Sequence, residues 1–143
     1  MPDILHDLTI LSDSDRVFDA ISTPLGLDSW WTLDAAGTPA PGARYQFGFG
    51  PNYAWEGVVR IYEPGLAIAW EMTRADADWL GTVVGFTLIP GSGDTRVAFY
   101  HRNWREANAH FRTSSYCWGL YLRLLRRYVE DGEIVPYGQR NDV

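Results

Sequence analysis

The stretch WREANAHFRTSSYCWGLYLRLLRRYVEDG, Trp104 to Gly132, is the longest segment of the chain with a regular helical pattern. At about 100° per residue, most of its charged side chains fall on one face of a helix and its apolar side chains on the opposite face. The charged face holds Arg112, Arg123, Arg126, Arg127 and Glu130, and the opposite face holds Phe111, Ser114, Trp118, Tyr121, Leu122, Leu125, Tyr128 and Val129. A stripe this broad predicts a long amphipathic helix that covers a core.

Capping residues set the expected ends of this helix. Asn103, with Glu106 three positions later, predicts a capping pair at the start. Gly132 predicts the end, and Pro136 keeps the helix from resuming.

The N-terminal part predicts one strand and two short helices. The strand covers Asp3 to Leu11 because Ile4, Leu8 and Ile10 alternate on one face. Ser12 and Ser14 are the expected N-caps of a helix from Arg16 to Ser22, which Pro24 interrupts. A second short helix is expected over Leu25 to Trp31.

Five alternating runs between residues 44 and 102 predict an antiparallel meander. Turns are expected at Pro51-Asn52, at Glu63-Pro64-Gly65 and from Pro90 to Asp94. The strands are Arg44–Phe49, Tyr53–Tyr62, Leu66–Thr73, Trp79–Ile89 and Thr95–Arg102, with apolar faces that include Val59 and Ile61, Leu66 and Met72, and Val97, Phe99 and His101.

The expected fold is therefore α+β, a single domain over residues 1–143 in which about six antiparallel strands curve around a long C-terminal helix. A sheet with one apolar face must bury that face, and the long helix is the only segment large enough to cover it. A curved sheet closing on a helix leaves a space, which we interpret as a binding cavity.

Composition narrows the function classes. The net charge of −6 argues against nucleic acid as a partner. The single cysteine, Cys117, excludes an internal disulfide framework, and no apolar run resembles a signal peptide or a membrane span. We expect a cytoplasmic protein. Aromatic residues are abundant, with 7 Trp, 8 Tyr and 6 Phe, and such rings line ligand pockets as well as fill cores.

The order of elements, together with particular residues, resembles the START-like superfamily (SRPBCC), which has the helix-grip fold. Within it, the chain is most similar to the branch named after the activator of heat-shock protein 90 ATPase. The resemblance rests on Ser14 to Ile21, Trp30-Trp31, Gly57-Val58, Pro64-Gly65-Leu66, Trp70, Gly93 to Val97, His101, Trp104, Trp118, Leu122, Leu125, Tyr128 and Gly132.

The resemblance implies three functions that the residues leave open. Members bind hydrophobic ligands, act as cyclases or aromatases, or assist a chaperone, and no functional residue is shared across the branches. We expect binding of a small hydrophobic ligand, aromatic or lipid-like, with a cyclase-, aromatase- or hydrolase-type enzyme and a chaperone-accessory module as alternatives. The resemblance implies that eukaryotic relatives with the chaperone role carry a further N-terminal domain, and we expect none in this protein.

The expected ligand contacts are the aromatic residues of the strands and the residues facing them from the helix. They are Tyr45, Phe47, Trp55, Trp70, Phe86, Phe99, His101, His110, Ser114, Trp118 and Tyr121. Aromatic walls with a few polar tips suit an oriented apolar ligand. The tryptophans Trp30, Trp31 and Trp104 lie at element ends, where they either plug the core or gate the pocket.

The sequence gives weaker support for a catalytic site or a metal site. His101 could act as an acid or base with Tyr121 or Tyr128, or it could be a core histidine with satisfied nitrogens. Cys117 and His110 lack an orienting third group for a nucleophilic pair. The three histidines have no metal-ligand spacing, so we expect no metal and no cofactor.

Overall fold

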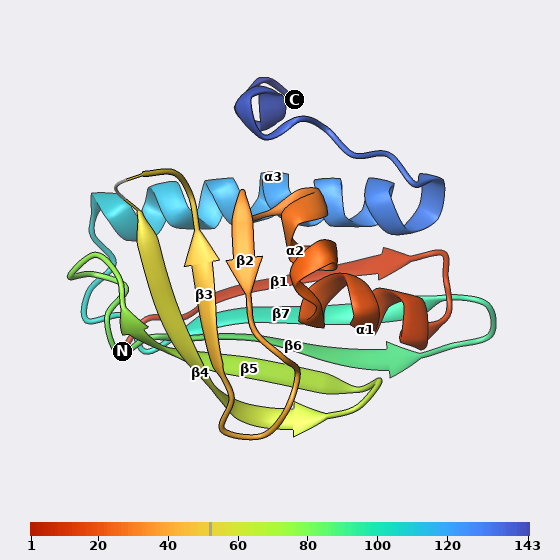
Figure 1. Ribbon diagram of the computed structural model, residues 1–143, viewed down its shortest axis with the longest axis horizontal. Helices are drawn as coiled ribbons and strands as arrows, with labels where there is room; N and C mark the ends of the chain where they lie inside the picture. Colours follow the sequence, from red (N-terminus) through yellow and green to blue (C-terminus); the bar gives the residue numbers. More distant parts are fainter. Residues whose placement is uncertain (52) are drawn as a thin grey trace.

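A computed structural model describes residues 1–51 and 53–143 (Figure 1). In this part of the chain, seven strands form one antiparallel sheet in the order β1-β7-β6-β5-β4-β3-β2. The strands are β1 (Ile4–Ile10), β2 (Asp34–Ala36), β3 (Arg44–Gly48), β4 (Ala54–Glu63), β5 (Ala67–Arg74), β6 (Val83–Pro90) and β7 (Thr95–Arg102). The helices are α1 (Ser14–Ser22), α2 (Pro24–Trp30), α3 (Ala109–Asp131) and the short 3₁₀ helix η1 (Tyr137–Asp142).

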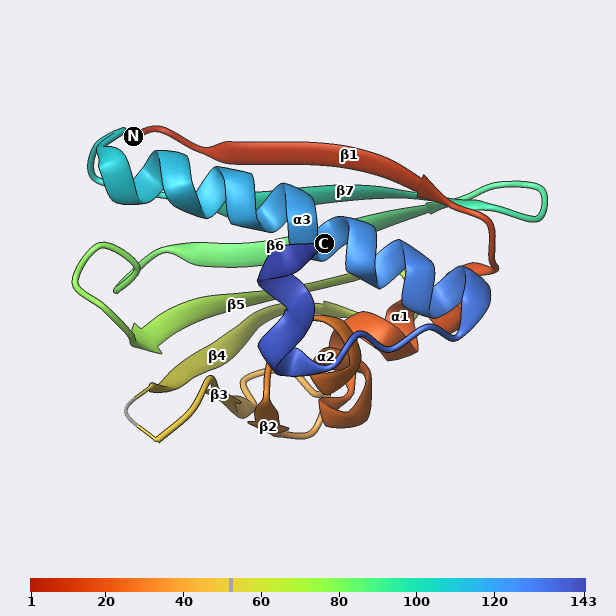
Figure 2. The same cartoon turned by 90° about the horizontal axis from the view of Figure 1, so that it is seen from above.

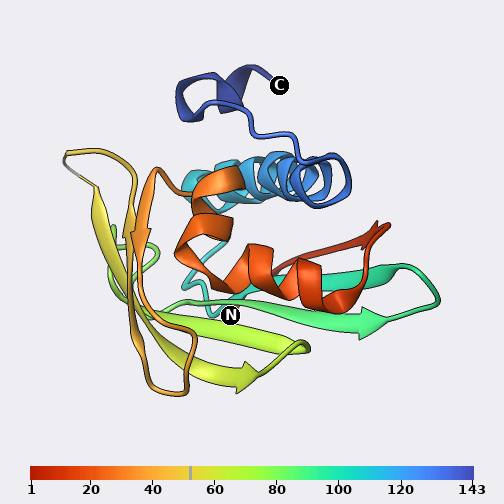
Figure 3. The same cartoon turned by 45° about the vertical axis from the view of Figure 1, so that its right-hand side comes forward.

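The sheet curves around the helices, and the predicted helix-grip fold is confirmed. Figure 3 shows the sheet bending around α1, α2 and α3, which lie on its inner side. Seen from above, α3 runs across the sheet, and the C-terminal segment turns back over α3 toward α2 (Figure 2). The predicted order of elements is correct, but the sheet has one strand more than the expected six.

The long helix starts later than predicted. Asn108 is its N-cap, and the Asn108 side chain accepts a hydrogen bond of 2.9 Å from the backbone N–H of Phe111. Asn103 cannot cap it, because Asn103 has a left-handed φ of 72° and lies six residues before the helix begins at Ala109. The predicted end is correct, since Gly132 adopts the left-handed conformation typical of a helix C-cap.

Several other boundaries differ for local reasons. The N-cap of α1 is Asp13, whose side chain accepts a hydrogen bond of 2.8 Å from the backbone N–H of Arg16. Neither Ser12 nor Ser14, the predicted caps, has this role. Strand β6 begins at Val83, and Trp79 lies in the turn before it. Strand β2 has only three residues, too few for an alternating pattern, and was not predicted.

Two residues predicted to face the core are exposed. Ile61 is 43% exposed because the pairing of β4 with β5 shifts register between Val59 and Ile61, and such a bulge reverses the side on which later residues point. Leu66 lies in the turn before β5 and is 44% exposed. The predicted turn at Pro51-Asn52 includes residue 52, which lies outside the described residues.

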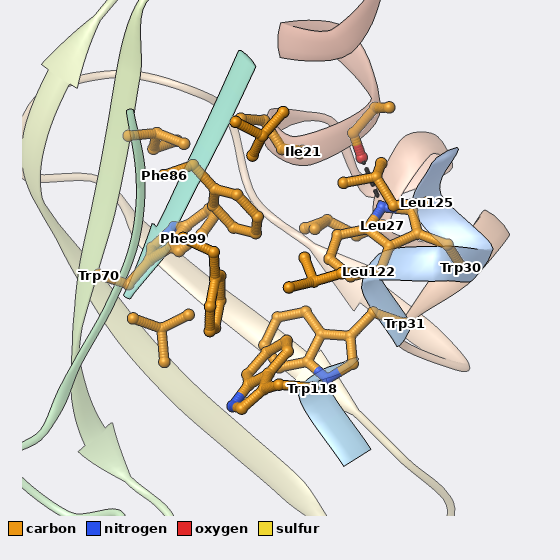
Figure 4. Packing of buried hydrophobic residues seen from close by; sticks show 14 of the residues in the cluster. Ile21, Leu27, Trp30, Trp31, Trp70, Phe86, Phe99, Trp118, Leu122 and Leu125 are labelled. Carbon is orange, nitrogen blue, oxygen red and sulfur yellow. Dashed lines mark hydrogen bonds between the residues drawn. The ribbon is translucent and has the colours of Figure 1, made fainter. Parts of the chain in front are cut away.

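Aromatic side chains fill the space between sheet and helix. Phe99 extends from the sheet to Trp118 on α3, and Phe86 and Trp70 lie beside it in the same cluster (Figure 4). The rings of Phe99 and Trp118 lie 4.6 Å apart, and those of Phe86 and Phe99 lie 5.2 Å apart. This part of the expected cavity is therefore packed core, and open space lies at its edge.

Candidate ligand-binding site

An aromatic pocket opens where five segments meet at one end of the sheet–helix interface. Its volume is about 260 Å³. Its lining consists of seven aromatic residues and one carboxylate: Trp31, Phe49, Tyr53, Trp55, Trp79, Tyr121, Tyr137 and Asp76. These residues come from the end of α2, the β3–β4 hairpin, the β5–β6 turn, α3 and η1. We refer to them together as the aromatic pocket.

Two buried tryptophans connect the aromatic pocket to the core. Trp31 is 3% exposed and Trp79 is 7% exposed. Both rings contact Trp118, at centroid distances of 4.9 Å and 5.9 Å. The Trp79 Nε1–H donates to Ser114 Oγ at 3.3 Å, which fixes the indole against α3. This side of the pocket is therefore rigid and apolar.

The wall is a continuous row of rings set at steep angles to one another. Trp31 and Phe49 lie 5.5 Å apart at 59°, Phe49 and Trp55 5.2 Å apart at 66°, and Trp55 and Trp79 4.8 Å apart at 52°. Neighbouring rings in this row are close enough to be in contact with one another. The row therefore forms one continuous aromatic wall along the opening.

The C-terminal segment forms the opposite side. Tyr137 donates from its hydroxyl to the carbonyl of Phe49 at 3.2 Å. Arg140 is 3% exposed and donates to the carbonyls of Val135, Thr32 and Asp28 at 2.9, 3.2 and 2.7 Å. A buried guanidinium needs several acceptors of this kind, and these bonds hold the segment against α2.

Tyr121 supplies a polar group from α3. Burial is the main cause that raises the pKa of Tyr121, and nearby Tyr137 adds to it, so the hydroxyl stays protonated at neutral pH. Tyr121 lines the aromatic pocket, where its hydroxyl can donate a hydrogen bond to a ligand or accept one from it.

His101 is held as a neutral core histidine. Trp118 Nε1–H donates to His101 Nδ1 at 3.1 Å, so the ring proton lies on Nε2, which is 2.8 Å from Thr82 Oγ1. Thr82 in turn donates to the carbonyl of Trp79 at 2.5 Å. Burial, with a smaller effect from His110, lowers the pKa of His101 to about 3. Both nitrogens are occupied and the imidazole is fully buried, which makes it unsuited to proton transfer.

The other histidine named as a candidate lies elsewhere. His110 Nδ1 is 3.0 Å from Asp78 Oδ2 at the start of α3, outside the aromatic pocket. The Trp104 ring lies between the two histidines, at 4.8 Å from His101 and 5.7 Å from His110. The structure does not bring His101, His110 and Tyr121 to one point.

No group of three His, Cys, Asp or Glu side chains in the described part of the chain is placed to hold a metal ion. No helix among residues 1–51 and 53–143 is long and apolar enough to cross a membrane.

Comparison with known proteins identifies the family. The sequence profile described as "Activator of Hsp90 ATPase homolog 1-like protein" matches residues 12–130. The chain belongs to this family. A search of curated proteins found no match.

Solved structures agree with this Hsp90-activator-like family and its fold. The Aha1 dimer from Colwellia psychrerythraea is 27% identical, with a TM-score of 0.84 over 93% of this chain and 99% of that one. The protein SSP2350 from Staphylococcus saprophyticus is 15% identical, with a TM-score of 0.79 over 94% and 96%. CalU16 from Micromonospora echinospora is 14% identical, with a TM-score of 0.74 over 98% and 83%. The predicted resemblance is confirmed.

The eleven residues expected to contact a ligand are spread over different environments. Trp55 and Tyr121 line the aromatic pocket, Ser114 lies behind Trp79, and His110 lies at the start of α3. The remaining seven are buried in the core: Tyr45, Phe47, Trp70, Phe86, Phe99, His101 and Trp118. Direct contact of these seven with a ligand stays a prediction, one that requires the core to open.

Six lining residues were not among the expected contacts. Trp31 was predicted only as a residue near the pocket mouth, together with Trp30 and Trp104, which are both buried in the core. Phe49 and Tyr53 flank the β3–β4 turn, and Asp76 and Trp79 belong to the β5–β6 turn. The aromatic residues in these two turns were the signal that could have identified them. Tyr137 follows the long helix and has no periodic pattern around it.

Proposed function

We propose that the protein binds a small, largely apolar molecule in the aromatic pocket. The observation that carries this proposal is the lining itself, in which seven of the eight residues are aromatic. Ligand sites are concave and mostly apolar, with a few polar groups that orient the ligand. Here those groups are the Tyr121 hydroxyl and the Asp76 carboxylate.

The volume limits the size of the ligand. Sites for drug-sized molecules occupy about 300–1,000 Å³. At about 260 Å³, the aromatic pocket suits a molecule of one or two rings better than a long-chain lipid. Of the aromatic and lipid-like ligands expected from the sequence, the aromatic class is favoured.

A larger hollow of about 640 Å³ between α1, α2 and the end of α3 is a weaker candidate. Its lining includes Arg16, Asp19 and Thr23, with Leu25 76% exposed beside them. Its described lining contains one aromatic residue, Tyr128, so it offers an apolar ligand far fewer ring contacts.

Binding can be measured by calorimetry with a panel of one- and two-ring aromatic compounds. We expect Trp55→Ala to abolish or strongly weaken binding, because this substitution removes a wall of the pocket while the tryptophans behind it remain. Leu80→Ala is the matched control, since Leu80 lies in the same turn as Trp79, is 44% exposed and does not line the pocket. A panel that binds Trp55→Ala as tightly as the unchanged protein would contradict the proposal.

Family membership supports a second candidate, contact with the Hsp90 chaperone. Nearly the whole length of the Colwellia Aha1 structure aligns with this chain at 27% identity. Pull-down with the chaperone of the same host, followed by measurement of its ATPase rate, tests this role. If the chaperone does not co-purify and its ATPase rate does not change, this second role is wrong.

A further inference from the structure

Asp76 is the one charged residue in the described lining of the aromatic pocket. The other lining residues are rings, whose faces carry partial negative charge. Both features attract positive charge and disfavour an anion. This inference rests on the proposed function and narrows the class of ligand.

The position of Asp76 is set by the turn that also carries Trp79. The Asp76 carbonyl accepts from the backbone N–H groups of Trp79 and Leu80 at 2.9 and 3.0 Å. The carbonyl is thus used within the turn, while the carboxylate has no ion pair or hydrogen bond among the described residues. The turn therefore places a carboxylate beside one of the tryptophans of the pocket.

No basic residue forms an ion pair with this carboxylate in the described part of the chain. Arg74, two residues before Asp76, lines a second hollow together with Trp55 and Asp76, so Asp76 lies between that hollow and the aromatic pocket. Arg140 lies 5.4 Å from the ring centroid of Tyr137, outside the pocket lining, and binds three carbonyl groups. The protein as a whole has a net charge of −6, which raises the local concentration of cations.

We propose that the aromatic pocket selects a small organic cation, an alkylated ammonium group with an apolar body. Aromatic faces set at angles around an opening can contact such a group from several sides, and each contact is favourable through the cation–π interaction. An alkylated ammonium also loses less hydration on entering than a primary ammonium does. Asp76 acts as its counter-ion at the rim.

The test compares choline with its uncharged carbon isostere, 3,3-dimethylbutan-1-ol, by calorimetry at low ionic strength. The two probes have nearly the same shape, so their difference reports the charge. We expect choline to bind about tenfold more tightly, the effect of two or three cation–π contacts. Asp76→Asn lowers the affinity for choline several-fold and leaves the isostere unchanged.

Asp131→Asn is the matched control because it changes the net charge equally. Asp131 lies ten residues along α3 from Tyr121, roughly 15 Å away, and does not line the pocket. Equal losses of choline affinity in the two variants would show a general effect of net charge and overturn the role of Asp76.

The outcomes separate this inference from the proposed function. If the isostere binds as tightly as choline, or only uncharged aromatic compounds bind, cation selection is wrong while the pocket remains a binding site. If neither the two probes nor the aromatic panel binds, both proposals fail.

Discussion

At the scale of single residues, the bond network of His101 explains why a buried histidine is tolerated in an aromatic core. Its Nδ1 accepts from Trp118 and its Nε2–H donates to Thr82, so neither polar atom is left unpaired. The network also connects α3 to the turn that carries Trp79. His101 thus positions the tryptophans behind the pocket.

Acid is expected to destabilise the protein through His101. Its folded pKa of about 3 lies below the unfolded value of 6.5, so the unfolded state binds more protons between these two pH values. Stability from this residue is complete above pH 6.5 and falls by up to about 1.4 kcal/mol per pH unit as the pH decreases toward 3.

The measurement is urea unfolding of the unchanged protein and of His101→Gln between pH 7 and pH 4.5. The unchanged protein should lose more stability over this range, and the imidazole signals of His101 should not titrate above pH 4. If the free energy of unfolding changes with pH in the same way in both proteins, or if His101 titrates near pH 6.5, the assignment of His101 as a neutral core histidine is wrong.

Tyr121 and Trp118 are both expected contacts from α3 but should respond differently to substitution. Tyr121→Phe should weaken binding of the best aromatic ligand by about 0.5–1.5 kcal/mol, the net value of one hydrogen bond, with little effect on unfolding. Trp118→Ala should cost about 3–5 kcal/mol of stability because it empties core volume. Loss of stability in Tyr121→Phe with unchanged affinity would make Tyr121 an ordinary core residue.

At the scale of elements, the start of α3 determines where Phe111 and Ser114 meet the sheet. Asn108→Ala should lower the free energy of unfolding by about 1 kcal/mol, because it removes the cap of the Phe111 N–H. Glu106→Ala, at an exposed residue of the preceding loop, should change it by less than about 0.5 kcal/mol. Chemical denaturation measures the free energy of unfolding of both variants. A larger loss in Glu106→Ala than in Asn108→Ala would support the capping pair predicted from the sequence instead.

Patterns within an element were predictable, and departures from the pattern were not. Thr95–Arg102 was predicted as a strand with Val97, Phe99 and His101 inward, and the structure confirms it. Alternation fails at Ile61 because an extra residue in the pairing with β5 shifts the register, and a register shift leaves no mark in the strand's own sequence.

At the scale of the whole molecule, the aromatic pocket is made by segments that are far apart in the sequence. Trp31, Trp55, Trp79, Tyr121 and Tyr137 come from five separate places in the chain. The sequence predicted an aromatic site between sheet and helix, but it could not show that core rings would fill most of that space. The position of the opening depends on tertiary packing at element ends.

The C-terminal segment is expected to depend on Arg140. Arg140→Lys supplies a shorter, unbranched donor that cannot reach three carbonyls at once, so residues 134–143 should detach more often. Hydrogen exchange in this segment should rise and ligand affinity should fall as Tyr137 moves away. Arg105→Lys, at an exposed position before α3, is the matched control. Unchanged exchange in Arg140→Lys would contradict the role of Arg140.

The most direct test of the aromatic pocket follows the seven indole N–H signals of the protein by NMR during titration with a bound aromatic ligand. Trp31, Trp55 and Trp79 line the pocket, whereas Trp30 and Trp70 are fully buried in the core. We predict that the signals of the first three shift and that those of Trp30 and Trp70 stay in place. Shifts centred on Trp70 and Trp30, with Trp55 unmoved, would place the ligand in an opened core and contradict the account.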